Sequence, residues 1–469
     1  MQTKNVVLFI TDGHRTDMLG CYGNALLETP RIDAFARDSV LLRRAFCTHS
    51  VCMPTRASLF TGRYPHVHGV WANGLPLPKT EVTLPQVFSE AGYATAAAGK
   101  IHFEPQQAYT DGFCPAISEP YYGFDEVHLS ENRLGHEYLD WVREQAPEQA
   151  ELVRQRKDVP EELHELHWTV SQTIDFIRRS ASDSTPFFCS CSFHELSPPS
   201  TPPLGYTDHY APEDVPIPIL DLDDLDLRPE FYRQCYEGYL ARGRQPDEAA
   251  LRRHIASSYD QMRFIDKQFG RVVSTLKELG IWEETIVLFT ADHGLSLNDH
   301  YQWRHGPFLF DEVINVPMMW HVPGGGGRGK ETAEMVESVD VMPTLLDLCE
   351  LPIPAGVQGH SVASLLAEPE AGAGRESVLI QEREAPDLAA RGLQPESITQ
   401  IGIRTSDTKL IHYPGRPFGE LYDLSNDPGE FRNLWRDPGY GTLRQDMMGL
   451  LTDRLADSQD PLPERSYDW

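Results

Sequence analysis

The sequence has few positive charges for its size. Its 469 residues include 41 Lys and Arg against 70 Asp and Glu, which gives a net charge of −29 at pH 7. Nucleic acids and anionic membranes are bound through an excess of Lys and Arg, so this balance argues against both as partners. If the ligand is an anion, a local group of cations must attract it against the field of the whole chain.

Long apolar runs and paired cysteines are also missing. No stretch approaches the ~20 apolar residues that are needed to cross a bilayer. The apolar run near the start is too short for a signal peptide and has no small-residue cleavage site. The eight cysteines include no C-x-x-C pair and do not form a disulfide framework. These absences predict a cytoplasmic protein whose thiols are mostly reduced.

Three apolar runs rich in β-branched and aromatic residues end in polar side chains, which are Asp12, His194 and Asp292. Such runs without alternation are typical of strands buried on both faces of a mostly parallel sheet. Residues 256–280 show helical spacing of apolar residues, and Gly280 supplies the stop. We therefore expect an α/β fold with a large, mostly parallel mixed sheet flanked by helices. Ligands of such sheets bind at the carboxyl ends of the strands.

The character of the chain changes near residue 370. Residues 1–370 form the expected catalytic domain, and residues 371–469 are predicted to form a smaller domain of short antiparallel strands and a closing helix. The stretch 199–230 is rich in Pro and Asp. It is interpreted as a surface excursion, with a lid over the site as the alternative. The glycine-rich residues 324–330 lack the spacing of a phosphate-binding loop and are interpreted as a flexible loop.

Cys52 begins the string Cys-Met-Pro-Thr-Arg. Because Pro54 suits the first turn of a helix, Cys52 is expected at a helix N-terminus, where free backbone N–H groups attract an anion. Arg56 lies one turn along and can reach the same place. A lone Cys is commonly only a small buried hydrophobe. The residue types alone leave both interpretations of Cys52 open.

The string C-x-P-[ST]-R followed by ASLFTGR resembles the signature of the sulfatase family, in which a maturation enzyme oxidises this Cys to formylglycine. Further segments resemble the family in the same order along residues 5–434: TDGHRTDMLGCYGN, GYATAAAGKIHF, FTADHGLSLNDHYQWRHGPF and ELYDLSNDPGEFRNL. The resemblance implies the fold of alkaline phosphatases, a small-molecule sulfate ester substrate and a maturation enzyme as partner. It leaves open whether the chain forms a homo-oligomer.

The resemblance implies one divalent metal ion, bound by Asp12, Asp292, His293 and the side chain derived from Cys52. Most relatives carry a second acidic or amide ligand directly after the first Asp, where this chain has Gly13. Calcium prefers six to eight oxygen ligands, whereas imidazole suits transition ions. We therefore expect manganese rather than calcium.

The resemblance also implies catalytic roles. Formylglycine hydrates to a diol, one hydroxyl of which attacks sulfur while Arg56, Lys100 and the metal neutralise the sulfuryl oxygens. His102 is expected to hydrogen-bond a formylglycine hydroxyl and to help remove its proton. Because Lys100 and His102 are two positions apart, an extended segment would direct both side chains to one face.

Three further residues are expected at the site. Asn73 matches a substrate-binding Asn in part of the superfamily. Ser197 stands where a substrate-binding His is expected, and His194 is the proposed replacement. His305 replaces the Lys that precedes Gly-x-Phe in the family. A His can neutralise the leaving oxygen near neutral pH; the alternative is that His305 only packs beside Trp303.

Two other functions are considered. A phosphonate monoester or phosphodiester hydrolase could use the same site, because tetrahedral sulfur and phosphorus esters look alike. The Lys-x-His element, typically replaced in that branch, is intact here and favours sulfate. A binding protein on a decayed enzyme fold is disfavoured, because the residues that resemble the nucleophile, cations and metal ligands are all present.

Overall fold

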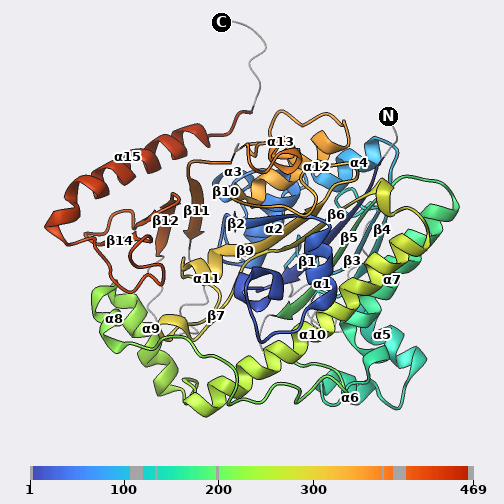
Figure 1. Ribbon diagram of the computed structural model, residues 1–469, viewed down its shortest axis with the longest axis horizontal. Helices are drawn as coiled ribbons and strands as arrows, with labels where there is room; N and C mark the ends of the chain where they lie inside the picture. Colours follow the sequence, from blue (N-terminus) through green and yellow to red (C-terminus); the bar gives the residue numbers. More distant parts are fainter. Residues whose placement is uncertain are drawn as a thin grey trace, which may run out of the picture.

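The computed structural model describes residues 4–105, 120–131, 136–196, 200–371, 374–383 and 398–462 (Figure 1). Its main sheet has eight strands in the order β10-β2-β9-β6-β1-β5-β3-β4. β9 runs antiparallel to both of its neighbours, and all the other pairs are parallel. The predicted mixed, mostly parallel sheet is confirmed. Its strands are β1 (Asn5–Asp12), β2 (Val40–Phe46), β3 (Ala94–Gly99), β4 (Glu126–Leu129), β5 (Phe187–Leu196), β6 (Thr285–Ala291), β9 (Asn315–His321) and β10 (Glu331–Glu337).

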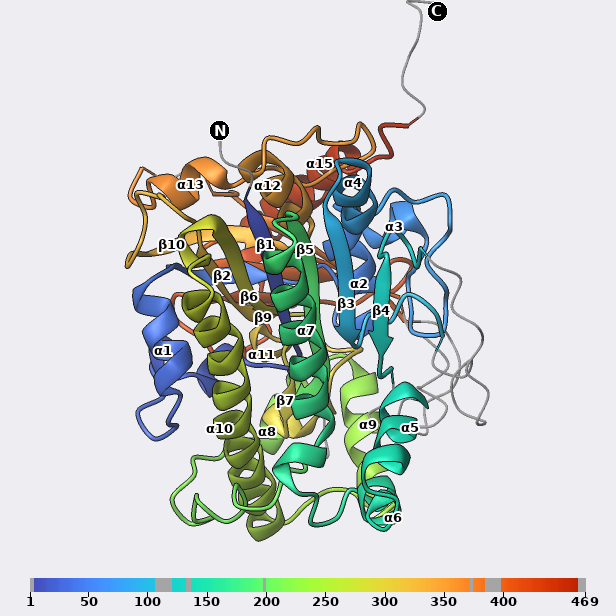
Figure 2. The ribbon, with the colours of Figure 1, turned by 90° about the vertical axis from the view of Figure 1, so that its right-hand side faces the viewer.

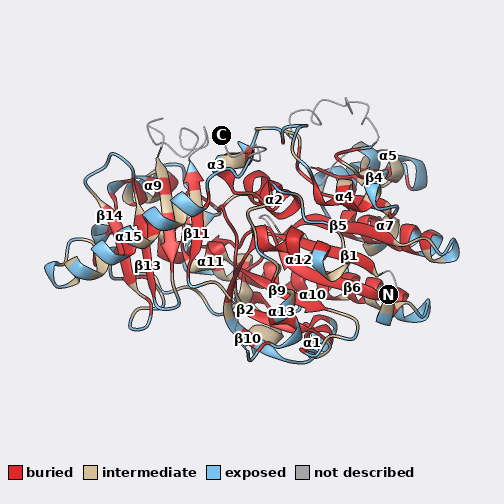
Figure 3. Cartoon of the chain, turned by 90° about the horizontal axis from the view of Figure 1, so that it is seen from above, coloured by how far each residue is buried: buried red, intermediate tan, exposed pale blue. Residues whose placement is uncertain are grey.

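The central strand β1 is apolar without alternation because both of its faces are buried. Every residue of β1 is buried. Val6 and Leu8 point into the core on one face of the sheet. Val7 and Phe9 point into the core on the other face. Because both faces are covered, successive side chains are apolar whichever way they point. Figure 3 shows this buried interior running through the main sheet.

Helices cover the two faces of the main sheet. α1, α7 and α10 pack on one face, where α7 and α10 lie along the strands (Figure 2). α2, α4, α12 and α13 pack on the other. The helix predicted over 256–280 is confirmed, but it begins earlier, where the side chain of Asp247 caps the amide of Ala250. The helices are α1 (Pro30–Arg37), α2 (Cys52–Thr61), α3 (Pro65–His68), α4 (Leu84–Glu90), α5 (His136–Gln145), α6 (Ala150–Gln155), α7 (Glu165–Ser182), α8 (Leu222–Leu227), α9 (Glu230–Ala241), α10 (Glu248–Glu278), α11 (Asp311–Ile314), α12 (Val341–Leu348), α13 (Ala363–Ala367) and α15 (Gly441–Asp457).

The Pro- and Asp-rich stretch is largely irregular. From residue 200, where its description begins, no helix or strand forms before α8, and Ile219 is 70% exposed. This fits the surface excursion, while the lid stays a prediction. A two-stranded hairpin, β7 (Ser296–Leu297) and β8 (Trp303–Arg304), follows β6. Among the described residues, no helix is both long and apolar enough to cross a membrane.

A second sheet has four antiparallel strands in sequence order, β11 (Val378–Arg383), β12 (Thr399–Arg404), β13 (Thr408–His412) and β14 (Gly419–Asp423). Three of these strands and the closing helix α15 were predicted, and β14 was not. α15 packs on the outer side of this small sheet (Figure 1). Ile380 and Ile411, on the inner side, belong to the core of the main sheet. The boundary near residue 370 stays a prediction, because this core is shared.

The small sheet also holds the segment that follows His305. Gln400 donates to the carbonyl of Pro307 at 2.5 Å. Lys409 donates to the carbonyl of Leu309 at 2.8 Å. Its buried ammonium also lies 2.8 Å from Asp311 and 2.5 Å from Glu430. These contacts fix the path of the chain between the hairpin β7–β8 and α11.

We predict that Lys409→Met destabilises the fold by about 3–5 kcal/mol, because removing the ammonium leaves the buried Glu430 carboxylate without its counter-charge. Urea unfolding would measure the change. Lys330→Met is the matched control, because Lys330 is 43% exposed and its pair with Glu370 spans 3.6 Å. An exposed pair of this kind contributes about 0–1 kcal/mol. Equal losses in the two variants would contradict the prediction.

Candidate active site

Two aspartates meet at the carboxyl ends of adjacent strands. Asp12 ends β1, and Asp292 directly follows β6, whose last residue pairs with Thr11. Both aspartates are completely buried. The amide of Gly13 donates to Asp292 Oδ1 at 3.3 Å, and the φ of Gly13 is +64°, in the left-handed region that favours glycine. Gly13 therefore serves the turn after β1, and it offers no side chain as a ligand.

Cys52 is the first residue of α2, as predicted. The helix begins here because Val51 is extended and Pro54 suits the first turn. Asn73 accepts the amide of Met53 at 3.0 Å, and so satisfies one of the free N–H groups of the first turn. The Cys52 Sγ is buried, 3.5 Å from Asp12 Oδ2. The start of α2 is thus directed at the aspartates.

His293 turns one ring nitrogen toward Cys52. Its Nε2 lies 3.2 Å from the Cys52 Sγ, and its Nδ1 lies 2.7 Å from the carbonyl oxygen of Gly294. A carbonyl only accepts, so Nδ1 carries a hydrogen and Nε2 is the nitrogen that faces the site. Burial lowers the pKa of His293, but the charge of Asp292 and the contact with Cys52 outweigh it and raise this pKa to about 10. The site therefore attracts positive charge.

The ligand atoms of Asp12, Cys52, Asp292 and His293 all lie within 4.8 Å of one another. Asp12 Oδ1 is buried and has no hydrogen-bond partner among the described residues. Burying a carboxylate oxygen without a partner is costly unless a cation binds it. The orphaned oxygen, the inward Nε2 of His293 and the two carboxylates together fit a divalent cation.

Two buried cations complete this cluster. Arg56 Nε donates to Asp292 Oδ2 at 2.8 Å, and Nη1 donates to the Lys100 carbonyl and to Ser192 Oγ, both at 2.8 Å. Lys100 forms an ion pair with Asp12 Oδ2. Burial raises the pKa of Asp12, but Lys100 and other positive groups outweigh it and hold this pKa well below its usual range. Asp12 is therefore ionised, and each of the two carboxylates has a cation beside it.

The geometry expected for Lys100 and His102 was wrong. β3 ends at Gly99, and His102 has a φ of +63°, so the segment is not extended. The buried carboxylate of Glu131 holds this turn by accepting the amides of Ile101 at 3.2 Å and His102 at 2.9 Å. Burial and the charges of Lys100 and Arg56 lower the pKa of His102 well below its usual value. His102 is therefore a neutral imidazole near the two cations.

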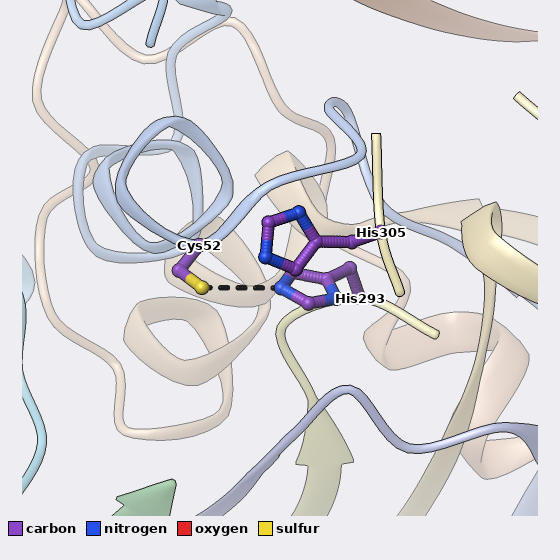
Figure 4. Close-up of side chains that lie close together, drawn as sticks. All are labelled: Cys52, His293 and His305. Carbon is purple, nitrogen blue, oxygen red and sulfur yellow. Dashed lines mark hydrogen bonds between the residues drawn. The ribbon is translucent and has the colours of Figure 1, made fainter. Parts of the chain in front are cut away.

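His305 lies beside His293. Their ring centroids are 4.8 Å apart, at an interplanar angle of 63°. Ligand atoms of His305, His293 and Cys52 also lie within 4.8 Å of one another (Figure 4). A Cβ at Gly306 would meet Ser50 Oγ at 2.6 Å, so the His305 loop packs closely on the loop before Cys52. The packing of His305 is thus part of the site and not separate from it.

The two predicted substrate-binding residues differ in burial. His194 is buried in β5, where its charge contributes to the lowered pKa of Asp12. Asn73 is exposed, and its side-chain oxygen is engaged by the amide of Met53. Ser197 lies outside the described residues.

Sequence reasoning missed three residues that support the site. Glu131 holds the His102 turn, and Ser192 binds Arg56. Glu382, in β11, accepts a hydrogen bond from Ser50 Oγ and lies 3.2 Å from His49 Nδ1. Glu131 and Glu382 stand in no motif, and all three residues are far from their partners in sequence, so spacing along the chain did not indicate these contacts.

The comparisons with known proteins bear on this arrangement. A family model described as Sulfatase matches residues 4–351. The chain belongs to the sulfatase family. A second model, described as the C-terminal part of N-sulphoglucosamine sulphohydrolase, matches residues 299–457. The sulfatase model thus covers both aspartates, Cys52 and the histidines of the site.

Individual relatives cover nearly the whole sulfatase chain. An arylsulfatase of Clostridium perfringens is 30% identical over 93% of this chain and 91% of its own. A multifunctional alkaline phosphatase superfamily protein, PehA of Trinickia caryophylli, is 28% identical over 95% and 94%. The crystal structure of a phosphonate monoester hydrolase of Agrobacterium radiobacter has a TM-score of 0.82 at 25% identity, over 98% and 97%. The expected fold and a sulfuric ester hydrolase are confirmed.

We predict that Glu131 positions His102. Glu131→Ala should lower kcat on an aryl sulfate by about 100-fold with little change in KM, because a displacement of about 1 Å has a cost of that order. Glu131→Gln should recover much of this loss, since its amide oxygen can still accept the two N–H groups. Steady-state kinetics would measure both variants.

The control is Glu126→Ala, because Glu126 begins the strand that precedes Glu131 but contacts the exposed Arg179 and the half-buried His128. It should leave kcat unchanged. If Glu131→Ala loses thermal stability but keeps its kcat, Glu131 is structural only and the prediction is wrong.

Proposed function

We propose that this sulfatase hydrolyses a sulfate monoester to an alcohol or phenol and inorganic sulfate, through a formylglycine made from Cys52 by a maturation enzyme. The observation that carries the proposal is the position of the Cys52 side chain. It begins α2 within 4.8 Å of two strand-end aspartates and His293, while Arg56 is buried against the same carboxylates.

One divalent metal would be held by Asp12, Asp292, His293 and residue 52. When bound, it would lower the pKa of a hydroxyl on residue 52 and neutralise charge on the sulfuryl group. Lys100 pairs with Asp12 through Oδ2, which leaves Oδ1 for the ion. An imidazole ligand and the bare Gly13 support manganese over calcium.

Formylglycine supplies a hydrated aldehyde, one hydroxyl of which can attack sulfur while the other allows sulfate to be released. The remaining chemistry belongs to the side chains around it. Arg56 and Lys100 lie where they can bind the sulfuryl oxygens and stabilise their charge. The neutral imidazole of His102 can accept a proton from the second hydroxyl.

His305 is the proposed general acid for the leaving oxygen. It lies near residue 52 on the same side as His293 (Figure 4). A positioned imidazole can both carry charge and donate a proton. We propose that His194 and Asn73 contact the substrate, with His194 in the role that the family's His has at the position of Ser197.

Hydrolysis of phosphonate monoesters or phosphodiesters is the second candidate. It is supported by the likeness to the phosphonate monoester hydrolase and by the identity with PehA, which is described as multifunctional. The intact Lys100-x-His102 element supports sulfate instead. The two functions differ in the ester that they turn over fastest, and so they can be separated by kinetics.

The test compares specificity constants for matched aryl sulfate, phosphonate monoester and phosphodiester substrates. We expect the sulfate to have the highest kcat/KM, and Cys52→Ala to abolish all three activities while Cys47→Ser keeps them. A peptide covering residues 45–56 should carry an aldehyde that reacts with hydrazides. An alkylatable thiol in fully active protein would refute formylglycine, and a faster phosphonate would establish the second candidate.

His305→Ala gives a further prediction. Loss of a general acid should depress the hydrolysis of alkyl sulfates by about 10²–10⁴-fold and of nitrophenyl sulfate far less, because nitrophenolate leaves without a proton. Rates across a series of leaving groups would measure this. His209→Ala, at an exposed histidine, is the control. Equal losses for all leaving groups would show that His305 is a structural or plain sulfate-binding residue.

A further inference from the structure

The encoded Cys52 thiol belongs to two overlapping donor sets. One contains the two aspartates, Cys52 and His293. The other contains Cys52, His293 and His305, and therefore one sulfur and two imidazoles (Figure 4). The first set is rich in oxygen, and the second is the sulfur and nitrogen combination that zinc binds in proteins. Only the second set uses His305.

The geometry of the second set is close to that of a zinc site. Bond lengths of ~2.3 Å to sulfur and ~2.0–2.1 Å to nitrogen place tetrahedral ligand atoms about 3.5 Å apart. The Cys52 Sγ and His293 Nε2 are 3.2 Å apart, and the His305 ligand atom lies within 4.8 Å of both. The three ligand atoms are therefore gathered near one point, as a shared ion requires.

The surroundings favour binding. The Gly294 carbonyl accepts the Nδ1 hydrogen of His293, which orients its Nε2 toward the ion. Cys52 and His293 are buried, and His305 is half-buried. An ion here would be shielded from bulk water on most sides.

We propose that the unconverted protein, in which residue 52 is still cysteine, binds Zn²⁺ through Cys52, His293 and His305, with the fourth position open to water. The thiol gives its proton to bulk water when it binds. Thiolate and imidazole select zinc over manganese or calcium. Formylglycine has no sulfur, so conversion of Cys52 removes this site. The proposal does not require the protein to hydrolyse any ester.

The test uses full-length protein produced without the maturation enzyme, with Co²⁺ as the optical probe and Zn²⁺ as the competitor. Co²⁺ should give a sulfur-to-cobalt charge-transfer band with tetrahedral visible bands, and Zn²⁺ should displace it. X-ray absorption of the Zn²⁺ form should show one sulfur at ~2.3 Å and nitrogen or oxygen at ~2.0–2.1 Å. The absence of a sulfur ligand in either measurement overturns the proposal.

Variants then test His305 itself. Removing a residue that only hydrogen-bonds a metal ligand lowers metal affinity by about 10–100-fold. His305 is proposed to bind the ion directly, so His305→Ala should lower the Zn²⁺ affinity by at least about 100-fold. Mn²⁺ affinity should change little, because its proposed ligands remain. Cys52→Ser should abolish the charge-transfer band, and the controls Cys47→Ser and His209→Ala should keep it. Unchanged Zn²⁺ affinity in His305→Ala overturns the proposal, and the X-ray data on the unaltered protein stand even if a variant fails to fold.

Discussion

The structure depends on the pairing of buried charged side chains at the carboxyl ends of the central strands of the main sheet. Asp12 and Asp292 are completely buried. Lys100 forms an ion pair with Asp12, and Arg56 forms one with Asp292. Burying a charge costs several kcal/mol, which only close partners can offset. β1 and β6 must therefore be adjacent, α2 must begin at their carboxyl ends, and β3 must end beside them. The order of the central strands and the position of Cys52 thus satisfy a single electrostatic condition.

The sequence predicts those parts of the molecule whose cause is local. The strands before Asp12 and Asp292 can be predicted because both of their faces are buried, which makes their sequences apolar throughout. The start of α2 can be predicted from Pro54. The roles of the site residues came from resemblance, because spacing alone left Cys52 ambiguous. Lys100 and His102 show the limit of spacing. The rule of alternate faces holds only for extended chain, and the carboxylate of Glu131, from the turn after β4, holds this segment in a bend.

The residues that sequence reasoning missed act through partners that are distant in the chain. Glu131 accepts hydrogen bonds from the backbone amides of residues 101 and 102. Nearly every residue type has such an amide, so the residue types at these two positions do not indicate the contact. Lys409 and Gln400 bind backbone carbonyls after His305 in the same way. The second sheet thereby shapes the site without lining it. Three of its four strands were predictable from their composition, but their effect on the loops beside Cys52 depends on how the two sheets pack.

The contact of Glu382 with Ser50 has a consequence for the order of events during synthesis. Glu382 is 332 positions beyond Ser50. At 5–20 residues per second the ribosome makes this intervening chain in roughly 20–60 s. Throughout that interval, the turn before α2 lacks the strand that closes over it. A modifying enzyme that needs access to Cys52 therefore has a window set by translation, which the completed fold ends by burying the side chain.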